Sequence, residues 1–182
     1  MYQLSLLRQH FNSLVVGLFC AGFCSILFAS ENTPTVKASQ GVNSGKVVLI
    51  VGDSLSAEYG LSRGTGWVNL MSQQAAKESV KVKIVNASIS GDTTSGGRSR
   101  LPALLAQHKP TVVVIELGGN DALRGLPLTM TQDNLTAMTR AAQQAGAKVL
   151  LAGMQVPPNY GKAYTDAFAA AFVEVAQVTQ AA

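Results

Sequence analysis

The feature that most constrains the fold is a regular alternation of short apolar, β-branched runs with longer stretches of helical periodicity. Four runs of the first kind occur at residues 46–51, 80–85, 111–117 and 147–153. Stretches with helical character follow them in turn, at residues 66–79, 98–107, 129–145 and 162–178. This β-α-β-α-β-α-β-α order predicts an α/β fold with a parallel, doubly wound sheet, as in flavodoxin-like three-layer domains.

The composition of individual runs indicates their place in the sheet. Residues 46–51 (KVVLIV) and 111–117 (TVVVIEL) are almost continuously apolar, as expected for strands covered on both faces. Residues 80–85 (VKVKIV) alternate instead, which indicates an edge strand with one face in water. Thr129 and Gln132 form a capping-box pattern at the start of the helix predicted near 129–145, and Gly146 predicts its end.

The first 29 residues differ from the rest of the chain. Residues 14–29 (LVVGLFCAGFCSILFA) carry no charge and follow a segment with Arg8 and no acid, which is typical of a secretory signal peptide. The run is shorter than the ~20 residues that span a membrane, so we expect cleavage and a periplasmic or secreted protein. An uncleaved leader, which would be the only contact with a membrane, is the alternative. Residues 30–45 are polar and predict a linker, which leaves residues 46–182 as the domain.

Composition excludes several classes of function. Both cysteines, Cys20 and Cys24, lie in the predicted leader, so we expect no disulfide, thiol nucleophile or cysteine-based zinc site in the domain. The net charge is +4 and the basic residues form no run, which gives little support for nucleic-acid binding. No His, Asp or Glu cluster has the spacing of metal ligands, and we expect no metal and no cofactor.

Three loops carry candidate chemistry, because ligands of doubly wound sheets bind beyond the carboxyl ends of the strands. Ser54 follows the first strand in GDSL (52–55), Gly91 follows the second, and Asn120 follows the third in GGND (118–121). Each has an ordinary alternative: Ser54 as a helix cap, the Gly91 loop as a phosphate cradle, and GGND as a turn. Together, a hydroxyl, a glycine N–H and an amide at one sheet edge are the groups that acyl transfer needs.

These motifs, in this order, resemble the sequence blocks of the SGNH (GDSL) hydrolase family over about residues 46–172. The longer strings GDSLSAEYGL and ELGGNDALRG are similar to the periplasmic multifunctional acyl-CoA thioesterase, arylesterase and lysophospholipase subgroup. The resemblance implies an esterase or thioesterase that cleaves a small acyl ester or lipid-like substrate through an acyl-enzyme at Ser54. It also implies that the Ser54 N–H, the Gly91 N–H and the Asn120 amide hold the oxyanion.

The last block of that family, Asp-x-x-His, which supplies the general base and the residue that orients it, does not occur in these 182 residues. One histidine, His10, lies in the predicted leader. The other, His108, precedes the third predicted strand, about 23 Å from the edge at which Ser54 is expected. We therefore expect a domain that is incomplete at its C-terminus, with an open edge beyond the fourth strand and with very weak or no activity.

Other interpretations remain open. The chain could be a non-catalytic remnant that binds acyl chains, or a nucleotide-binding flavodoxin-like module, although it lacks a P-loop and a GxGxxG motif. Asp53 is expected to bond backbone N–H groups of its turn, and Asp92 and Asp121 to fix loop geometry. A further set of loop residues is apolar enough to form an acyl pocket but could equally pack on the core: Leu123, Leu126, Met154, Val156, Pro157 and Tyr160.

Overall fold

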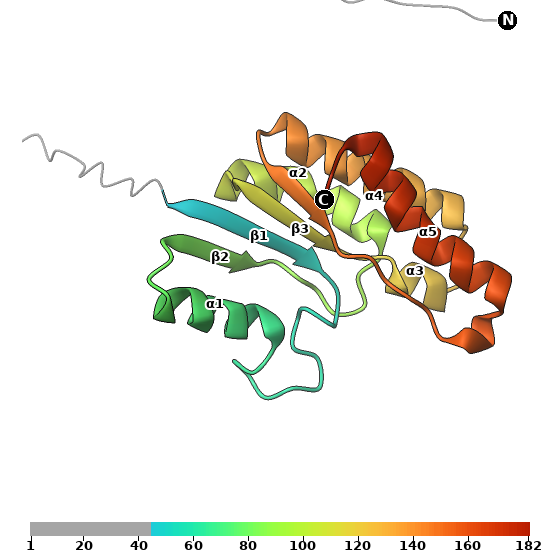
Figure 1. Ribbon diagram of the computed structural model, residues 1–182, viewed down its shortest axis with the longest axis horizontal. Helices are drawn as coiled ribbons and strands as arrows, with labels where there is room; N and C mark the ends of the chain where they lie inside the picture. The colour runs from blue at the N-terminus through green and yellow to red at the C-terminus, as the bar shows by residue number, and fades with distance from the viewer. Residues whose placement is uncertain (1–44) are drawn as a thin grey trace, which may run out of the picture. The chain divides into compact units, whose positions relative to one another are not determined.

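The computed structural model describes residues 45–182, so the predicted leader (1–29) and all but the last residue of the predicted linker (30–45) lie outside the described residues. The four strands form one parallel sheet in the order β2-β1-β3-β4 (Figure 1). The strands are β1 (Lys46–Gly52), β2 (Val82–Asn86), β3 (Val112–Glu116) and β4 (Lys148–Leu151). The helices are α1 (Trp67–Lys77), α2 (Thr94–His108), α3 (Gly119–Leu123), α4 (Leu128–Gln144), η1 (Pro158–Tyr160) and α5 (Lys162–Thr179). The predicted α/β fold is confirmed.

Helices cover both faces of the sheet, as the doubly wound prediction requires (Figure 1). On one face, alternate residues of the strands pack against α2, α4 and α5, because successive strand residues point to opposite sides. This main core includes Leu49, Val51, Val113, Ile115, Leu101, Leu135, Met138, Phe168 and Phe172. On the other face, α1 contacts β2 and its Val68 packs with Ile50 and Val114.

The two edges of the sheet differ in how they end. β2 lies at one edge, as its alternating sequence predicted, and its residues are at most half-buried. β4 lies at the other edge, where we expected a row of unpaired backbone groups. Some of these groups form hydrogen bonds. The Ala182 N–H donates to the Val149 carbonyl (3.1 Å), and the Ala182 carbonyl accepts from the Leu151 N–H (2.7 Å). The prediction of an open edge is therefore wrong at these two positions, because the chain returns along β4 after α5.

Local predictions failed where packing overrides propensity. α2 begins at Thr94 rather than near residue 98, although Gly96 and Gly97 are poor helix formers. A methyl group on Gly97 would lie 2.3 Å from Leu117 Cδ1, so the glycine lets α2 approach the strand end closely. The Thr93 side chain caps the helix by accepting from the Gly96 N–H (3.3 Å).

The capping-box prediction for the fourth helix is wrong. α4 begins at Leu128 with Pro127 at the N-cap position, which places Thr129 inside the first turn, where its side chain cannot cap. The helix ends before Gly146, as predicted, and the Gly146 N–H donates to the Gln143 carbonyl (2.9 Å). The short α3, formed by residues that were also compatible with a simple turn, was not predicted. Across residues 45–182, no helix has both the length and the apolar composition of a membrane span.

Candidate active site

The carboxyl ends of β1, β2 and β3 open onto a shared hollow of about 350 Å³. Ser54, Tyr59, Ser90, Gly91 and Asn120 line it. The strand register explains this convergence, since Ile50 pairs with Asn86 and Gly52 pairs with Glu116, so the three loops leave the sheet at one edge. The three residues that the sequence singled out, Ser54, Gly91 and Asn120, therefore lie together.

Ser54 lies in a turn directly after β1. The Asp53 carbonyl accepts from the Ser56 N–H (3.2 Å) and the Ala57 N–H (2.9 Å), which fixes the backbone on both sides of the half-buried serine. Among the described residues, no protein group accepts a hydrogen bond from the Ser54 hydroxyl or from its N–H. The hydroxyl thus faces the hollow without a base, and the N–H is free to meet an oxyanion.

His108 is the histidine within the described residues, and it lies far from the hollow. It is the last residue of α2, four residues before β3 starts, so it lies at the amino edge of the sheet. Ser54 follows β1 at the carboxyl edge. The seven residues of β1 alone span about 23 Å, beyond the reach of an imidazole to a hydroxyl.

Gly91 occupies a tight turn that presents its backbone to the hollow. The Asp92 N–H donates to the Ile89 carbonyl (3.1 Å), and Gly91 at the third position of this turn has φ +77°. A type II turn requires such a positive φ, which glycine adopts without strain. Arg124 stabilises the turn, because its Nη2 donates a hydrogen bond to the Gly91 carbonyl (2.8 Å).

Asn120 lines the hollow, but its amide hydrogens are already bonded to the protein. Nδ2 donates to Asp53 Oδ2 (2.9 Å) and to the Asp92 carbonyl (2.9 Å). An amide nitrogen has two hydrogens, so both are engaged. An oxyanion in the hollow must therefore share one of these hydrogens or displace an acceptor, a condition that the sequence motif did not reveal.

Asp53 is nearly fully buried beneath the hollow. Its Oδ1 accepts from the Leu55 N–H (3.0 Å), as predicted, while its Oδ2 holds Asn120. Burial raises the pKa of the Asp53 carboxyl, against the opposite influence of the hydrogen bonds from Leu55 and Asn120. Asp53 does not itself line the hollow, but its carboxylate holds the amide of Asn120, which does.

Asp92 and Asp121 fix loop geometry, in agreement with the sequence interpretation. Asp92 Oδ2 lies 2.8 Å from Arg100 Nε, which ties the Gly91 turn to α2. Asp121 is fully buried, and its two carboxylate oxygens accept from the Thr94 N–H (2.9 Å) and the Thr94 hydroxyl (2.5 Å). The carboxylate thus joins α3 to the first residue of α2.

Glu116, at the end of β3, is a buried carboxyl group that was not predicted to matter. Its Oε2 accepts from the Ser56 hydroxyl (2.7 Å) and the Asp53 N–H (3.3 Å). Its Oε1 is buried with no hydrogen-bond partner among the described residues. Burial raises the pKa of Glu116, and the neighbouring Asp53 carboxylate raises it further, against the hydrogen bond from Ser56.

This raised pKa predicts a pH dependence of stability. The folded protein binds the Glu116 proton more tightly than the unfolded chain does. The stabilisation that this proton provides is complete below the ordinary pKa of 4.5 and is lost as pH rises through the raised pKa. Glu116→Gln removes this titration while keeping an acceptor for Ser56. Urea unfolding across this range should show the variant gaining stability relative to the wild type as pH rises.

The exposed Glu174 on α5 provides the control, because Glu174→Gln should leave the slope with pH unchanged. Asp53, whose pKa is also raised, is present in both proteins, and its coupling to Glu116 is part of the difference that the comparison measures. Parallel pH profiles for the wild type and Glu116→Gln would contradict the assignment.

The six apolar residues predicted to form an acyl pocket do not line the hollow at Ser54. Leu123 is exposed, Met154 and Val156 are partly buried against the core, and Tyr160 stacks on Tyr164 with ring centroids 6.0 Å apart. Leu126 is half-buried and Pro157 is exposed.

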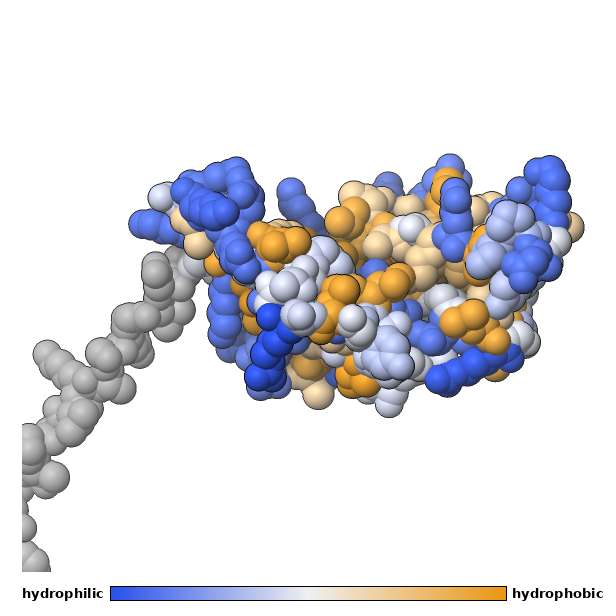
Figure 2. Space-filling view, turned by 90° about the horizontal axis from the view of Figure 1, so that it is seen from below, coloured by the Kyte–Doolittle hydropathy of each residue, from blue (hydrophilic) through white to orange (hydrophobic). Residues whose placement is uncertain are grey.

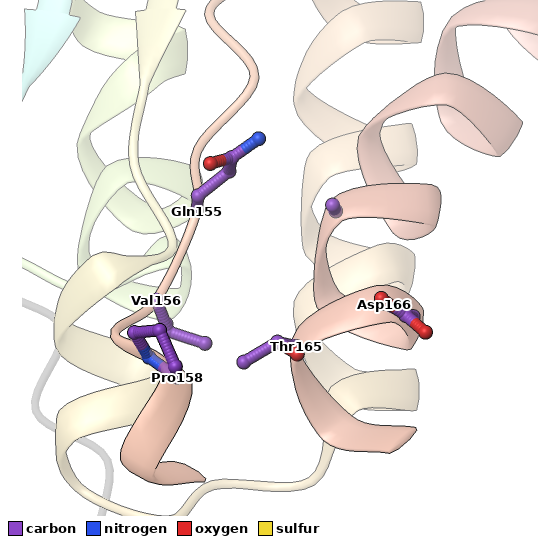
Figure 3. A pocket seen from close by; sticks show the side chains of 6 residues that line it. Gln155, Val156, Pro158, Thr165 and Asp166 are labelled. Atoms are coloured by element: carbon purple, nitrogen blue, oxygen red, sulfur yellow. The ribbon is translucent and has the colours of Figure 1, made fainter. Parts of the chain in front are cut away.

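Val156 borders a second, smaller cavity of about 230 Å³ between the segment after β4 and α5. Its side chain and that of Thr165 point toward each other across this space (Figure 3). The cavity is lined by Gln155, Val156, Pro158, Thr165, Asp166 and Ala169. It shares no lining residue with the hollow at Ser54.

Tyr59 and Ser90 line the hollow, and Arg124 bonds the Gly91 turn beside it, but none of the three was predicted as a site residue. Ser90 directly precedes Gly91 in the chain, and this position next to a candidate residue is the only feature of the sequence that points to it. Tyr59 and Arg124 lie in the strings GDSLSAEYGL and ELGGNDALRG that carry the family resemblance, but neither was assigned a role, because their approach to the hollow depends on the path of their loops. Within residues 45–182, no group of three or more His, Cys, Asp or Glu side chains is placed to hold a metal ion.

Comparison with known proteins agrees with this geometry. Residues 50–182 match the model of the GDSL-like Lipase/Acylhydrolase family. The chain is 53% identical over 133 residues to "Esterase TesA" of Pseudomonas aeruginosa, a match that covers 73% of this chain and 66% of that protein. It is 45% identical over 130 residues to "Thioesterase 1/protease 1/lysophospholipase L1" of Escherichia coli K12, covering 71% of this chain and 61% of that protein.

A solved structure shares the fold. The crystal structure of TesA superimposes with a TM-score of 0.74 at 52% sequence identity, covering 75% of this chain and 76% of that chain. The matches to the P. aeruginosa and E. coli proteins span 66% and 61% of the length of those proteins, which is less than two thirds of each.

Proposed function

The chain belongs to the GDSL-like lipase/acylhydrolase family, and from this premise we propose that its hollow is the acyl-binding part of an SGNH-type esterase or thioesterase site. Ser54 is the nucleophile in this proposal. Its attack on an acyl ester or thioester carbonyl gives a tetrahedral oxyanion, which expels the alcohol or thiol and leaves an acyl-enzyme for water to cleave. Small acyl esters and lipid-like esters, as in arylesterases and lysophospholipases, are the proposed substrates.

The observation that carries the proposal is the convergence of Ser54, Gly91 and Asn120 on one hollow. The N–H groups of Ser54 and Gly91 have no protein acceptor among the described residues, so both are available to an oxyanion. Asn120 supplies a third donor when one of its hydrogens turns from the Asp92 carbonyl. Hydroxyl, N–H groups and amide together favour acyl transfer over phosphate binding.

We further propose that these 182 residues alone give very weak turnover or none. Ser54 has no hydrogen-bonded base among the described residues, and His108 lies at the other edge of the sheet. The second candidate function, binding of acyl chains without catalysis, is favoured by the same observation. The two candidates differ in whether Ser54 is chemically activated.

Labelling with a fluorophosphonate probe tests both the site and its activation. We expect slow modification of Ser54 that accelerates as pH rises, because the hydroxyl has no base to remove its proton. Ser54→Ala should abolish labelling. Ser90→Ala, which removes the other serine hydroxyl lining the hollow, should leave it unchanged. Modification that persists in Ser54→Ala would overturn the assignment, and rapid labelling at neutral pH would overturn the proposed lack of a base.

For residues 1–29, we propose a signal peptide that directs export to the periplasm or the medium. The support is their composition, an uncharged apolar run after a segment with a base and no acid. The predicted linker, residues 30–45, would then begin the mature protein.

A further inference from the structure

Large apolar side chains are exposed around the hollow. Five of them, here called the rim, lie on the segments that line it: Leu55, Tyr59, Leu61, Ile89 and Leu123. Each is between 52% and 77% exposed. Figure 2 shows apolar residues among polar ones on the face that carries α1 and the segment after β1. Exposed large apolar side chains on several segments around one opening point to a contact surface.

Their positions tie the rim to the chemistry. Leu55 follows Ser54 directly, Ile89 precedes Ser90, and Tyr59 is itself a lining residue. Leu123 ends α3, the helix that begins with the Asn120 segment. A surface that receives these side chains would therefore meet the opening of the hollow.

The charges beside the rim favour an anionic partner. Arg124 is exposed next to Leu123, and Arg63 is exposed on the segment that carries Leu61. The acids of the same region are bonded to groups of the protein. Glu58 accepts from the N–H groups of Gly64 (3.1 Å) and Gly66 (2.8 Å), and Asp92 pairs with Arg100.

Asp53 and Asp121, the other acids near the hollow, are buried. Exposed apolar side chains flanked by arginines, with the nearby carboxylates buried or bonded within the protein, favour binding to the interface of an anionic lipid layer.

In place of the expectation that only an uncleaved leader contacts a membrane, we propose that the rim docks the protein on the surface of an anionic phospholipid layer, with the hollow of Ser54 facing the lipid. The inference rests on the proposed function, because such docking would bring lipid-like acyl esters to Ser54 directly from the layer. The rim enters the interface with its apolar side chains, and Arg124 and Arg63 meet the phosphate groups.

The single tryptophan of the chain reports on this contact. Trp67 begins α1 directly after the rim segment, is 39% exposed, and donates from Nε1 to the Ser56 hydroxyl (3.1 Å) beside Leu55. Vesicles of phosphatidylcholine and phosphatidylglycerol with brominated acyl chains should quench Trp67 fluorescence. Vesicles of brominated phosphatidylcholine alone should quench it less, and added salt should weaken quenching by the anionic vesicles.

Variants separate the rim from the rest of the chain, including residues 1–44. Leu123→Asp and Ile89→Asp should each lower the affinity measured by quenching about tenfold, since a charge replaces an apolar group at the interface. Val173→Asp, on α5, is the matched control, because Val173 is as exposed as the rim residues, at 57%, and should have no effect. Arg124→Gln should weaken binding to anionic vesicles, whereas Arg140→Gln, exposed on α4, should not.

Equal losses in Leu123→Asp and Val173→Asp, or no quenching by anionic vesicles in the wild type, would overturn the docking proposal. Labelling of Ser54 by the fluorophosphonate probe in lipid-free solution tests the proposed function independently of docking. If Ser54 is labelled but quenching does not depend on the rim residues, only the docking proposal is overturned. Quenching without labelling of Ser54 leaves a lipid-binding surface beside a hollow that lacks the proposed nucleophile.

Discussion

The purified 182-residue chain is expected to hydrolyse a p-nitrophenyl acyl ester no faster than its Ser54→Ala variant. A serine hydroxyl becomes a strong nucleophile when an adjacent base removes its proton. Within the described residues, Ser54 has no such partner, and His108 lies at the opposite edge of the sheet. Loss of the histidine from a serine-histidine unit can cost on the order of 10⁶ in kcat. The measurement is release of p-nitrophenol by both proteins at equal concentration.

His108→Gln serves as the control, because it should leave the rate at the same background level. Hydrolysis by the wild-type chain that disappears in Ser54→Ala would contradict this prediction. A base would then have to reach Ser54, and loss of the same activity in His108→Gln would identify it. Activity that survives Ser54→Ala would instead come from another group.

Replacement of Asp121 is expected to cause the largest loss of stability among the site residues. Asp121 is fully buried, and its carboxylate accepts from both the N–H and the hydroxyl of Thr94. The Thr94 hydroxyl in turn accepts from Asn134 Nδ2 (3.1 Å), so three helices meet in one network. In Asp121→Asn, an NH₂ group would face one of these donors. The expected cost is about 2–4 kcal/mol in the free energy of unfolding.

Urea denaturation followed by circular dichroism measures this loss. The matched control is Asp166→Asn on α5, where the carboxylate is 62% exposed and pairs with Lys162 one turn away. Such an exposed pair contributes at most about 0.5 kcal/mol. If Asp121→Asn and Asp166→Asn change stability equally, the buried network does not hold α2 and α3 together.

The sheet and the meeting of its loops could be predicted because both follow from short-range patterns. Continuous β-branched runs predict the buried strands, and the alternation in residues 80–85 predicts the edge strand. The parallel topology then places the loops after the strands at one edge of the sheet. With those in place, Ser54, Gly91 and Asn120 had to converge. The resemblance to a known family added roles for these residues.

What could not be predicted depends on contacts between distant segments. The start of α2 at Thr94 depends on how closely Gly97 approaches Leu117, which overrides the low helix propensity of glycine. The engagement of both Asn120 hydrogens depends on Asp53, 67 positions away. Glu116 is buried because strand register sets it beside Gly52. Periodicity and motifs carry no information about such partners.

The most direct test of the shared hollow is a crystal structure of the chain after prolonged reaction with a p-nitrophenyl phosphonate at high pH. We predict phosphorus bonded to Ser54 Oγ, with the phosphoryl oxygen about 3 Å from the backbone nitrogens of Ser54 and Gly91. Asn120 Nδ2 should have turned from the Asp92 carbonyl toward that oxygen. A phosphonyl group on Ser90, or a phosphoryl oxygen directed into solvent away from Gly91 and Asn120, would contradict the account.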